Sequence, residues 1–485
     1  DIGTGDWSSD VCSSDLEVPL MNEKQLKSVL LGSGAAVALL ATPAVAGEVD
    51  DLKAQIEALQ QRLDTVEVQQ TKIEDSQERV APANAVTAGD FPGSWKLPGS
   101  DTSISFSGYV KADFIYDFDA LTNSDSFGVS GIALDNSASA RRDGNVRLHA
   151  RQSRFRFDSR TPTDWGMMRT RIEGDFFGAN GNQTASNSNS FRLRQAFGQL
   201  GPVLAGQTFT TFSDTSTYPD TVDFYGCAGV EFARQAMIRY SASLAEGLGL
   251  DLAVENPQSR ITFANAAGTA RSTNTNDHMP DLVARFTYSD SWGAVNLAGV
   301  GRYFTFDAGN GQSDSSLGYG VHAGANVNLW EGGNIGGVFN FGDGIGRYIT
   351  GGLYRGAVAQ CTNPAKNLTP GTAGCNVDVD TIWSMGGMVR LTHRWTDNLR
   401  SNVHYGFVRT DVPVSQLTSA GLGTTAANGL NNSVDYLSGN IIWSPVSRVN
   451  IGLEVMHGWR DSHQSSQTNN AGEATRVQLG MQYVF

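Results

Sequence analysis

Hydrophobic and polar residues alternate one by one through long stretches of the chain after residue 102. In the last stretch, glutamine and glycine separate a row of apolar positions: Leu479, Met481, Tyr483 and Phe485. A period of two residues is that of a β-strand, whose successive side chains point to opposite faces. This strand therefore has one apolar and one polar face. It is either an ordinary half-buried edge strand or a strand that lies between lipid and water.

Sixteen segments of this kind follow one another along the chain. The first, from Thr102 to Phe118, places Phe106 and Phe114 on one face and Lys111 on the other. The remaining segments span residues 146–159, 166–178, 190–201, 202–212, 233–243, 248–256, 280–289, 293–306, 317–330, 334–342, 381–394, 398–410, 433–444, 448–460 and 473–485.

The connections between these segments alternate between short and long. The short ones are 160–165, 201–202, 244–247, 290–292, 331–333, 395–397 and 445–447. The long ones are rich in Asn, Ser, Thr and Gly, and they span 119–145, 179–189, 213–232, 257–279, 307–316, 343–380, 411–432 and 461–472. Outer-membrane barrels have tight turns on the periplasmic side and long loops outside. We therefore predict an all-β fold, a 16-stranded antiparallel transmembrane β-barrel (porin) over residues 102–485.

The residues before the barrel predict a processed leader. Residues 1–20 contain a stretch that resembles the translation of a sequencing adapter, and we interpret them as non-native. From Met21, a positive start, a short apolar run and a small-residue cleavage site have the layout of a signal peptide over residues 21–46. The run is too short for a spanning helix, which needs ~20 apolar residues. We expect the mature chain to begin at Gly47.

A helical seam with 3-4 spacing follows the leader. Its positions are Val49, Leu52, Ile56, Leu59, Leu63, Val66, Gln70, Ile73, Gln77 and Val80. This heptad pattern predicts an α-helical coiled coil over residues 47–81, in which the seam glutamines fix register and partner number. The alternative is one lone amphipathic helix lying on the barrel. Because an even number of strands leaves both barrel ends in the periplasm, we expect the coiled coil there, followed by a Pro/Gly linker over residues 82–101.

The net charge and the cysteine content bear on the possible partners and on a possible disulfide. The formal net charge of −14 argues against a nucleic-acid partner. It says little about the lumen, because a barrel segregates charge by face. Cys361 and Cys375 flank a Pro/Gly/Asn-rich segment and are candidates for a disulfide in an oxidising compartment; otherwise they are reduced and unrelated. Cys227 has no assigned role.

The alternation also assigns side chains to the lumen. On the fourth segment, for example, Phe191, Leu193 and Phe197 are assigned to the lipid face, which turns the intervening arginines inward. The predicted pore-lining basic wall consists of Arg154, Arg156, Arg169, Arg171, Arg192, Arg194, Arg239 and Arg285. In a narrow pore such a wall attracts anions, and the arginine fork binds carboxylate or phosphate at two points. The alternative is that these arginines pair with Glu173, Asp175 and other acids and only stiffen the wall.

Four motifs resemble the DcaP-type porin family: SFSGYVKADF at Ser105–Phe114, YPDTVDF at Tyr218–Phe224, MPDLVARF at Met279–Phe286 and GDGIGRY at Gly342–Tyr348. With the coiled coil, the likeness covers about residues 48–485. The resemblance implies a trimeric outer-membrane channel with a periplasmic N-terminal coiled coil and passive uptake of anionic solutes such as dicarboxylates. It also implies that the inward arginines and the third long link line the narrowest part of the pore.

That third link, residues 213–232, is the predicted constriction loop, because the third outer loop of sixteen-stranded porins folds into the lumen. Its candidate residues are Asp214, Tyr218, Asp220, Asp223 and Glu231. An acidic loop opposite an arginine wall would create a transverse field that orients dipolar solutes. The alternative is a solvated surface loop whose acids contact water.

We therefore expect a homotrimeric outer-membrane porin for passive diffusion of small anionic solutes, carboxylates or dicarboxylates. The alternative is a structural or adhesive trimeric anchor with a closed lumen. Enzymatic activity is not expected, since His393, the one histidine on the presumed outer face, has no fitting catalytic partner. The histidines lack metal-ligand spacing, and the glycines of 342–346 open no helix, so no cofactor or metal is expected. His322 and His404 are interpreted as pore-facing polar groups.

Overall fold

The computed structural model describes residues 55–67, 86–122, 125–135, 137–179, 181–182, 184, 186–265, 268–271, 275–351, 356–362, 374–411, 431–462 and 470–485. The chain divides into two compact units, one holding Thr102–Phe485 and the other ending at Asp101. Within the described ranges, no helix combines the length and the apolar character needed to cross a membrane.

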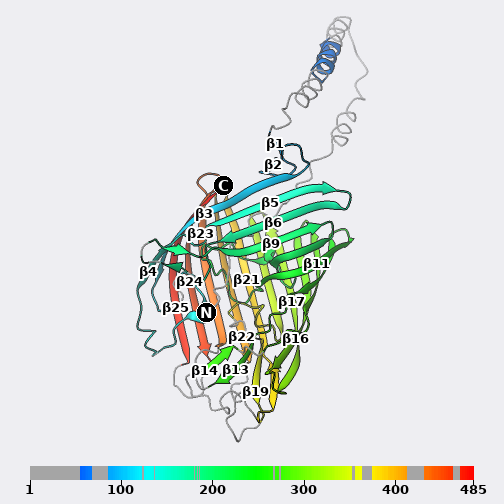
Figure 1. The fold of residues 1–485 in the computed structure, drawn as a ribbon. Helices are drawn as coiled ribbons and strands as arrows, with labels where there is room; N and C mark the ends of the chain where they lie inside the picture. The colour runs from blue at the N-terminus through cyan, green and yellow to red at the C-terminus, as the bar shows by residue number, and fades with distance from the viewer. Residues whose placement is uncertain are drawn as a thin grey trace, which may run out of the picture. The chain divides into compact units, whose positions relative to one another are not determined.

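Sixteen antiparallel strands form a closed barrel (Figure 1). They are β3 (Ser103–Asp117), β5 (Arg154–Thr163), β6 (Gly166–Asp175), β9 (Arg192–Leu200), β10 (Val203–Phe209), β11 (Arg234–Ala245), β12 (Leu248–Glu255), β15 (Asp281–Asp290), β16 (Gly293–Asp307), β17 (Ser313–Trp330), β18 (Gly333–Asp343), β21 (Trp383–Thr396), β22 (Leu399–Asp411), β23 (Asn431–Trp443), β24 (Val449–Ser462) and β25 (Ala471–Val484). Each strand pairs with the next of this series, and β25 returns to β3, which closes the ring. The predicted 16-stranded barrel is confirmed.

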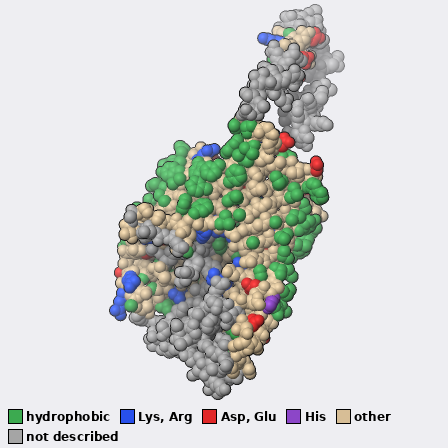
Figure 2. Space-filling model, viewed as in Figure 1, with side chains coloured by type: hydrophobic (Ala, Val, Ile, Leu, Met, Phe, Trp, Pro, Cys, Tyr) green, Lys and Arg blue, Asp and Glu red, His purple; other side chains and the backbone are tan. Residues whose placement is uncertain are grey.

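The outer face of the barrel is apolar, and its ends carry tryptophan. Hydrophobic side chains are spread over the outer wall in Figure 2. Five exposed tryptophans lie beside the short turns, at Trp165, Trp292, Trp330, Trp395 and Trp443, and two lie toward the long loops, at Trp383 and Trp459. Aromatic side chains at both interfaces of an apolar band are typical of membrane barrels.

Two irregularities change the strand and face assignments that the alternation predicts between β3 and β9. The second predicted strand, 146–159, is divided into β4 (Asn145–His149) and β5, which both pair with β3. The pairing of β6 with β9 shifts at Glu173, so that Phe197 lies directly opposite Arg171. The assignment of Phe197 to the lipid face is therefore wrong, because a β-bulge adds one residue and inverts the alternation beyond it.

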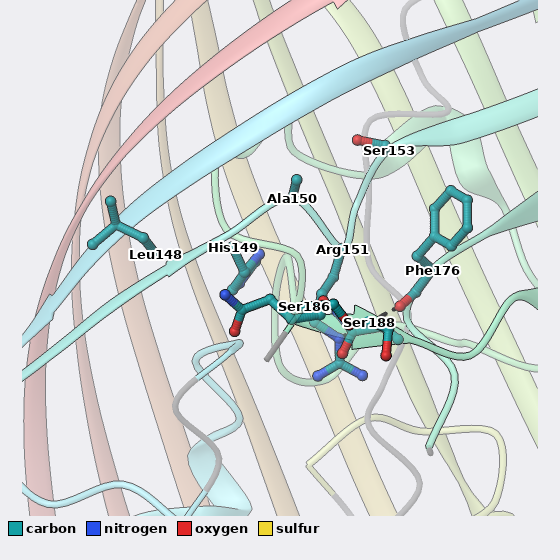
Figure 3. A pocket seen from close by; sticks show the side chains of 10 residues that line it. Leu148, His149, Ala150, Arg151, Ser153, Phe176, Ser186 and Ser188 are labelled. Atoms are coloured by element: carbon teal, nitrogen blue, oxygen red, sulfur yellow. Dashed lines mark hydrogen bonds between the residues drawn. The ribbon is translucent and has the colours of Figure 1, made fainter. Parts of the chain in front are cut away.

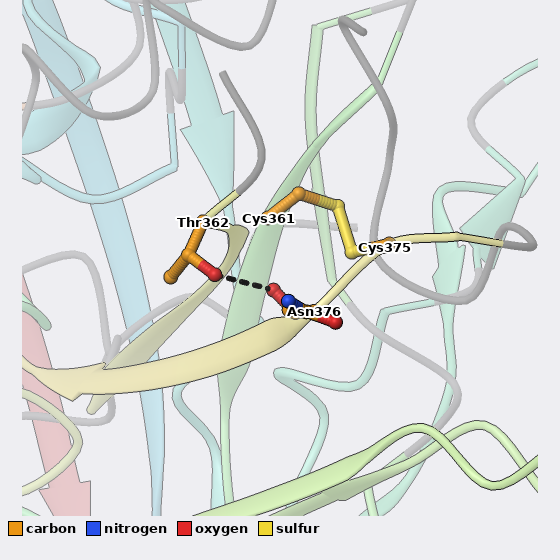
Figure 4. Close-up of a disulfide and its surroundings, with 4 residues drawn as sticks. All are labelled: Cys361, Thr362, Cys375 and Asn376. Carbon is orange, nitrogen blue, oxygen red and sulfur yellow. Dashed lines mark hydrogen bonds between the residues drawn. A yellow bond between two sulfur atoms is a disulfide. The ribbon is translucent and has the colours of Figure 1, made fainter. Parts of the chain in front are cut away.

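Two long links contain strands that the alternation did not predict. β13 (Ile261–Asn265) and β14 (Gly268–Arg271) follow β12, whereas β19 (Ala357–Cys361) and β20 (Val377–Thr381) follow β18. β13 and β19 pair in parallel, so the four strands form one small sheet. In Figure 1, β13, β14 and β19 lie at the end of the barrel away from the C-terminus. The disulfide Cys361–Cys375 joins the β19 and β20 ends of this hairpin (Figure 4).

The remaining elements are short. β7 (Gly181–Asn182) pairs with β8 (Ser188–Asn189) in the second long link. Single 3-10 turns, η1 (Val129–Gly131) and η2 (Thr215–Thr217), lie in the first and third links.

The N-terminal unit contains a helix over residues 55–67 and a hairpin of β1 (Thr87–Ala88) and β2 (Trp95–Lys96). Seam residues of the helix, among them Leu59 and Leu63, are exposed. The rest of the predicted coiled coil, the predicted signal peptide and residues 1–20 lie outside the described residues. The described part of this region thus holds one short helix, and its assembly into a coiled coil stays a prediction.

Candidate functional site

Three arginines of the predicted basic wall surround one carboxylate, that of Asp158. Asp158 lies on β5, directly opposite Arg171 of β6. Arg171 Nε donates to Asp158 Oδ1 at 2.9 Å and its Nη2 donates to Oδ2 at 3.2 Å, which is the two-point geometry of an arginine fork. Arg169 Nη2 lies 3.3 Å from Oδ1, and Arg156 Nε lies 3.2 Å from Oδ2. We call Asp158 and these three arginines the Asp158 cluster.

The arginines of the Asp158 cluster are partly exposed on the inner face, whereas its carboxylate is buried. The side chains of Arg156 and Arg169 are 33% and 27% exposed, whereas that of Asp158 is 4% exposed. Three positive charges against one negative charge leave a net charge of +2. The guanidinium of Arg169 also lies 5.8 Å from the ring centroid of Phe197, the residue that the bulge turns inward.

The other three arginines that were predicted for the wall on β5 and β9, namely Arg154, Arg192 and Arg194, share two carboxylates, those of Glu173 and Asp175. Arg194 Nε donates to Glu173 at 2.6 Å and its Nη1 donates to Asp175 at 3.0 Å. Arg192 Nη2 donates to Asp175 at 2.7 Å, and Arg154 lies 3.9 Å from Glu173. Since the side chains of Arg154 and Arg194 are only 4% and 0% exposed, these two stiffen the wall, as the alternative interpretation holds.

Arg239 of β11 and Arg285 of β15 extend the basic wall around the barrel. Strand pairing places Arg169, Gln199, Leu204 and Arg239 in one row across β6, β9, β10 and β11. At ~4.8 Å per strand, Arg239 lies about 14 Å from Arg169 along this row. Arg285 Nη2 donates to Asp251 at 2.7 Å. The buried Nε of Arg239 has no hydrogen-bond partner among the described residues.

The predicted constriction loop, residues 213–232, lies inside the barrel against the inner wall. Backbone carbonyls of the loop accept hydrogen bonds from wall side chains that lie far away in the sequence. Arg390 Nε donates to Thr217 O at 2.7 Å, His404 Nε2 contacts Gly226 O at 2.9 Å, and Lys111 Nζ donates to Val222 O. Most loop side chains between Thr217 and Phe232 are buried. His322 and His404, expected to face the pore, are buried under this loop.

Each acid of the constriction loop is bonded within the loop or to the wall that supports it. Asp220 pairs with Arg400 at 2.6 Å, and Asp223 pairs with Arg476 at 3.2 Å. Further contacts join Glu231 Oε1 to His322 Nδ1 at 3.0 Å, Asp214 to the side chain of Asn296, and the Tyr218 hydroxyl to the Glu231 carbonyl. Because these carboxylates contact residues of β16–β25, the loop does not present a free acidic rim to the basic wall.

Aromatic side chains join the loop to the basic wall instead. The ring of Phe224 stacks on Phe177 at a centroid distance of 3.6 Å, and the Arg192 guanidinium lies 5.2 Å from the Phe224 centroid. Phe127 and Ile132 of the first long link pack with the loop in one apolar cluster. Burial raises the pKa of the Cys227 thiol in this cluster well above its ordinary value.

Glycines on the inner wall leave room for the loop, and sequence reasoning missed them. A Cβ on Gly406 would lie 2.2 Å from the Ala228 carbonyl oxygen, and one on Gly452 would lie 2.5 Å from a Val222 methyl. Gly480 also faces Val222, with 2.6 Å to a Cβ. The available signal was the recurrence of glycine at inward positions of the last strands.

Apart from the lumen, a pocket of about 490 Å³ lies beside the break between β4 and β5 (Figure 3). His149, Arg151 and Phe176 line it, and Arg151 Nη2 donates to the Gly178 carbonyl at 2.7 Å. Nearby, burial alone would raise the pKa of Asp125, but a hydrogen bond from Arg147 and the charges of His149 and Arg151 bring that pKa below its ordinary value. The arrangement stabilises the first long link. Among the described residues, no group of three or more metal-ligating side chains is present.

Comparison with known proteins places the chain among barrels of this type. A family model described as DcaP outer membrane protein matches residues 36–485. The outer membrane channel DcaP of Acinetobacter baumannii aligns with a TM-score of 0.63 and 20% identity, over 82% of this chain and 100% of that chain. The anion-selective porin from Comamonas acidovorans aligns with a TM-score of 0.48 and 13% identity, over 79% and 100% of the two chains. No curated protein sequence matches.

Proposed function

Because the chain belongs to the DcaP outer membrane protein family, we propose that it is a porin for passive diffusion of small anionic solutes, carboxylates and dicarboxylates, across the outer membrane. The solutes pass between the basic wall and the constriction loop. The mature protein starts at Gly47 and assembles as a homotrimer, with the coiled coil of residues 47–81 in the periplasm and the linker 82–101 leading to the barrel.

The excess of positive charge in the Asp158 cluster is the observation that carries this proposal. Arg156, Arg169 and Arg171 share a single carboxylate, and their partly exposed side chains lie on the inner face. In a confined, low-dielectric passage, such an excess raises the local concentration of anions and repels cations.

The bonding of the loop acids supports the same conclusion. Asp220 pairs with Arg400 and Asp223 pairs with Arg476, so neither presents a free carboxylate to the basic wall. Selectivity then comes from net positive potential and from two-point hydrogen bonding to carboxylates, and the transverse field expected from the sequence is not required.

A swelling assay with proteoliposomes tests this function. Liposomes that contain the protein should swell faster in monocarboxylates and dicarboxylates than in a neutral sugar of similar size, and slowest in an organic diamine. The matched control is the triple variant R156Q/R169Q/R171Q, which changes the charge of the Asp158 cluster from +2 to −1. Equal swelling in anions and cations would contradict the proposal.

A second candidate function is that of a structural anchor with a closed lumen. The apolar cluster inside the barrel favours it, because Phe127, Phe212, Tyr225 and Val230 pack against inner-wall residues such as Tyr436. This function predicts no swelling in any solute, so the same assay separates the two candidates.

A further inference from the structure

We propose that Asp158 sets how tightly the channel holds its anions, by acting as a fixed counter-ion for the arginines around it. This inference rests on the proposed function and deepens it, because it names a residue that determines selectivity. A count of the arginine charges alone would not identify this residue. Asp158 is a positioning residue: it acts on permeating anions through Arg156, Arg169 and Arg171.

The geometry around Asp158 supports this role. Its two oxygens are contacted by Arg169 and Arg171 of the neighbouring strand β6 and by Arg156, two residues earlier on its own strand, β5. Arg156 Nε also donates to Ser107 Oγ of β3 at 3.2 Å. The carboxylate is therefore enclosed behind the guanidinium groups, and a solute in the lumen contacts the arginines before it contacts Asp158.

An arginine has five N–H donors, and the bonds to Asp158 use only part of them. The remaining donors of these partly exposed side chains are available to a carboxylate that passes through the lumen. Asp158 holds the guanidinium groups in place and cancels one of their three charges. A channel needs binding that is strong enough to attract a solute and weak enough to release it. Without this carboxylate, the cluster would carry +3 and hold anions longer.

The expected effect follows from Coulomb's law. Removal of one negative charge about 6 Å from a bound anion changes its binding at least about threefold even at the dielectric constant of water. The change is larger in a confined lumen and smaller at high ionic strength. Affinity should therefore rise while maximal flux stays level or falls, a split that a merely structural residue would not produce.

The test uses the full chain in planar bilayers, with chloride and the dicarboxylate succinate as probes. For D158N we expect a larger anion preference in a KCl gradient, and half-block of the chloride current at a succinate concentration at least about threefold lower. The maximal succinate current should not increase. D158E should restore wild-type values, and D290N, the same charge change at an exposed turn outside the lumen, should leave them unchanged.

A second variant keeps the test decisive if D158N does not fold. S107D adds a carboxylate within reach of Arg156 and should move the same quantities the opposite way, toward weaker block and lower anion preference. If folded D158N or S107D leaves both quantities at wild-type values while the wild type prefers anions, the role of Asp158 is wrong and the proposed function stands. If the wild type itself shows no anion preference, the proposed function fails.

Discussion

The ion pairs of Arg476 offer the sharpest test of how the constriction loop is held. Arg476 of β25 is fully buried, and its Nη2 donates to Asp117 Oδ2 at 3.0 Å. Its Nη1 lies 3.2 Å from Asp223 Oδ2 in the loop. The guanidinium also lies 5.6 Å from the ring centroid of Phe127, so it joins the wall, the third link and the first link.

Replacing Arg476 with Met would leave the carboxylates of Asp117 and Asp223 buried without their cation. Breaking a buried pair by removing one partner costs about 3–5 kcal/mol. The matched control is R400M, which removes the Asp220 pair. There both side chains are partly exposed, 20% and 13%, so screening by water reduces the expected loss to about 1 kcal/mol.

Urea-induced unfolding, followed by the fluorescence of the seven barrel tryptophans, measures both changes. R476M should unfold at clearly lower urea than R400M, and its single-channel conductance should rise because the loop loses a wall anchor. The triple variant R476M/D117N/D223N should recover part of the stability. Equal stability and equal conductance of R476M and R400M would refute the reasoning.

Three further outcomes are expected from the loop and its surroundings. G452A should push the constriction loop away from the wall and lower stability, whereas G301A, where no atom lies within 4 Å of the added Cβ, should not; equal unfolding curves would contradict this. The thiol of Cys227 should resist maleimide in the folded barrel and react fully after denaturation, because burial raises its pKa; rapid labelling of the folded protein would show that the loop is not packed. D125N should destabilise the first link at neutral pH, because the lowered pKa of Asp125 stabilises the fold above its unfolded value near 3.8. This difference from wild type should shrink as the pH falls through the folded pKa, and a constant difference would argue against the pairing with Arg147.

The barrel was predictable because lipid and lumen impose a period of two on every spanning strand. The assignment of side chains from this period fails at a β-bulge, because one inserted residue moves every later side chain to the opposite face of the sheet. Phe197 shows this: its neighbours in the sequence do not reveal that β9 shifts its register against β6. The strands β13 and β19 were missed because they pair between two links, outside the barrel alternation.

The inward course of the constriction loop could be expected from the order of the long links, but its contacts could not. Val222 donates its backbone N–H to the buried carboxylate of Glu454, more than two hundred residues away, and nothing local in the sequence indicates that pair. The sequence suggested that Asp220 and Asp223 form a free charged rim. Their partners, Arg400 and Arg476, lie far away in the sequence and become neighbours only in the folded barrel. Likewise, the alternation identified the inward arginines but not Asp158, whose carboxylate three of them share.

The reversal potential across a salt gradient tests the central claim most directly. Wild-type protein in a planar bilayer should give a potential of the sign that anion permeation produces. The triple variant R156Q/R169Q/R171Q should shift that potential toward zero or beyond. A wild-type potential of the opposite sign, or one that the triple variant leaves unchanged, would contradict the account.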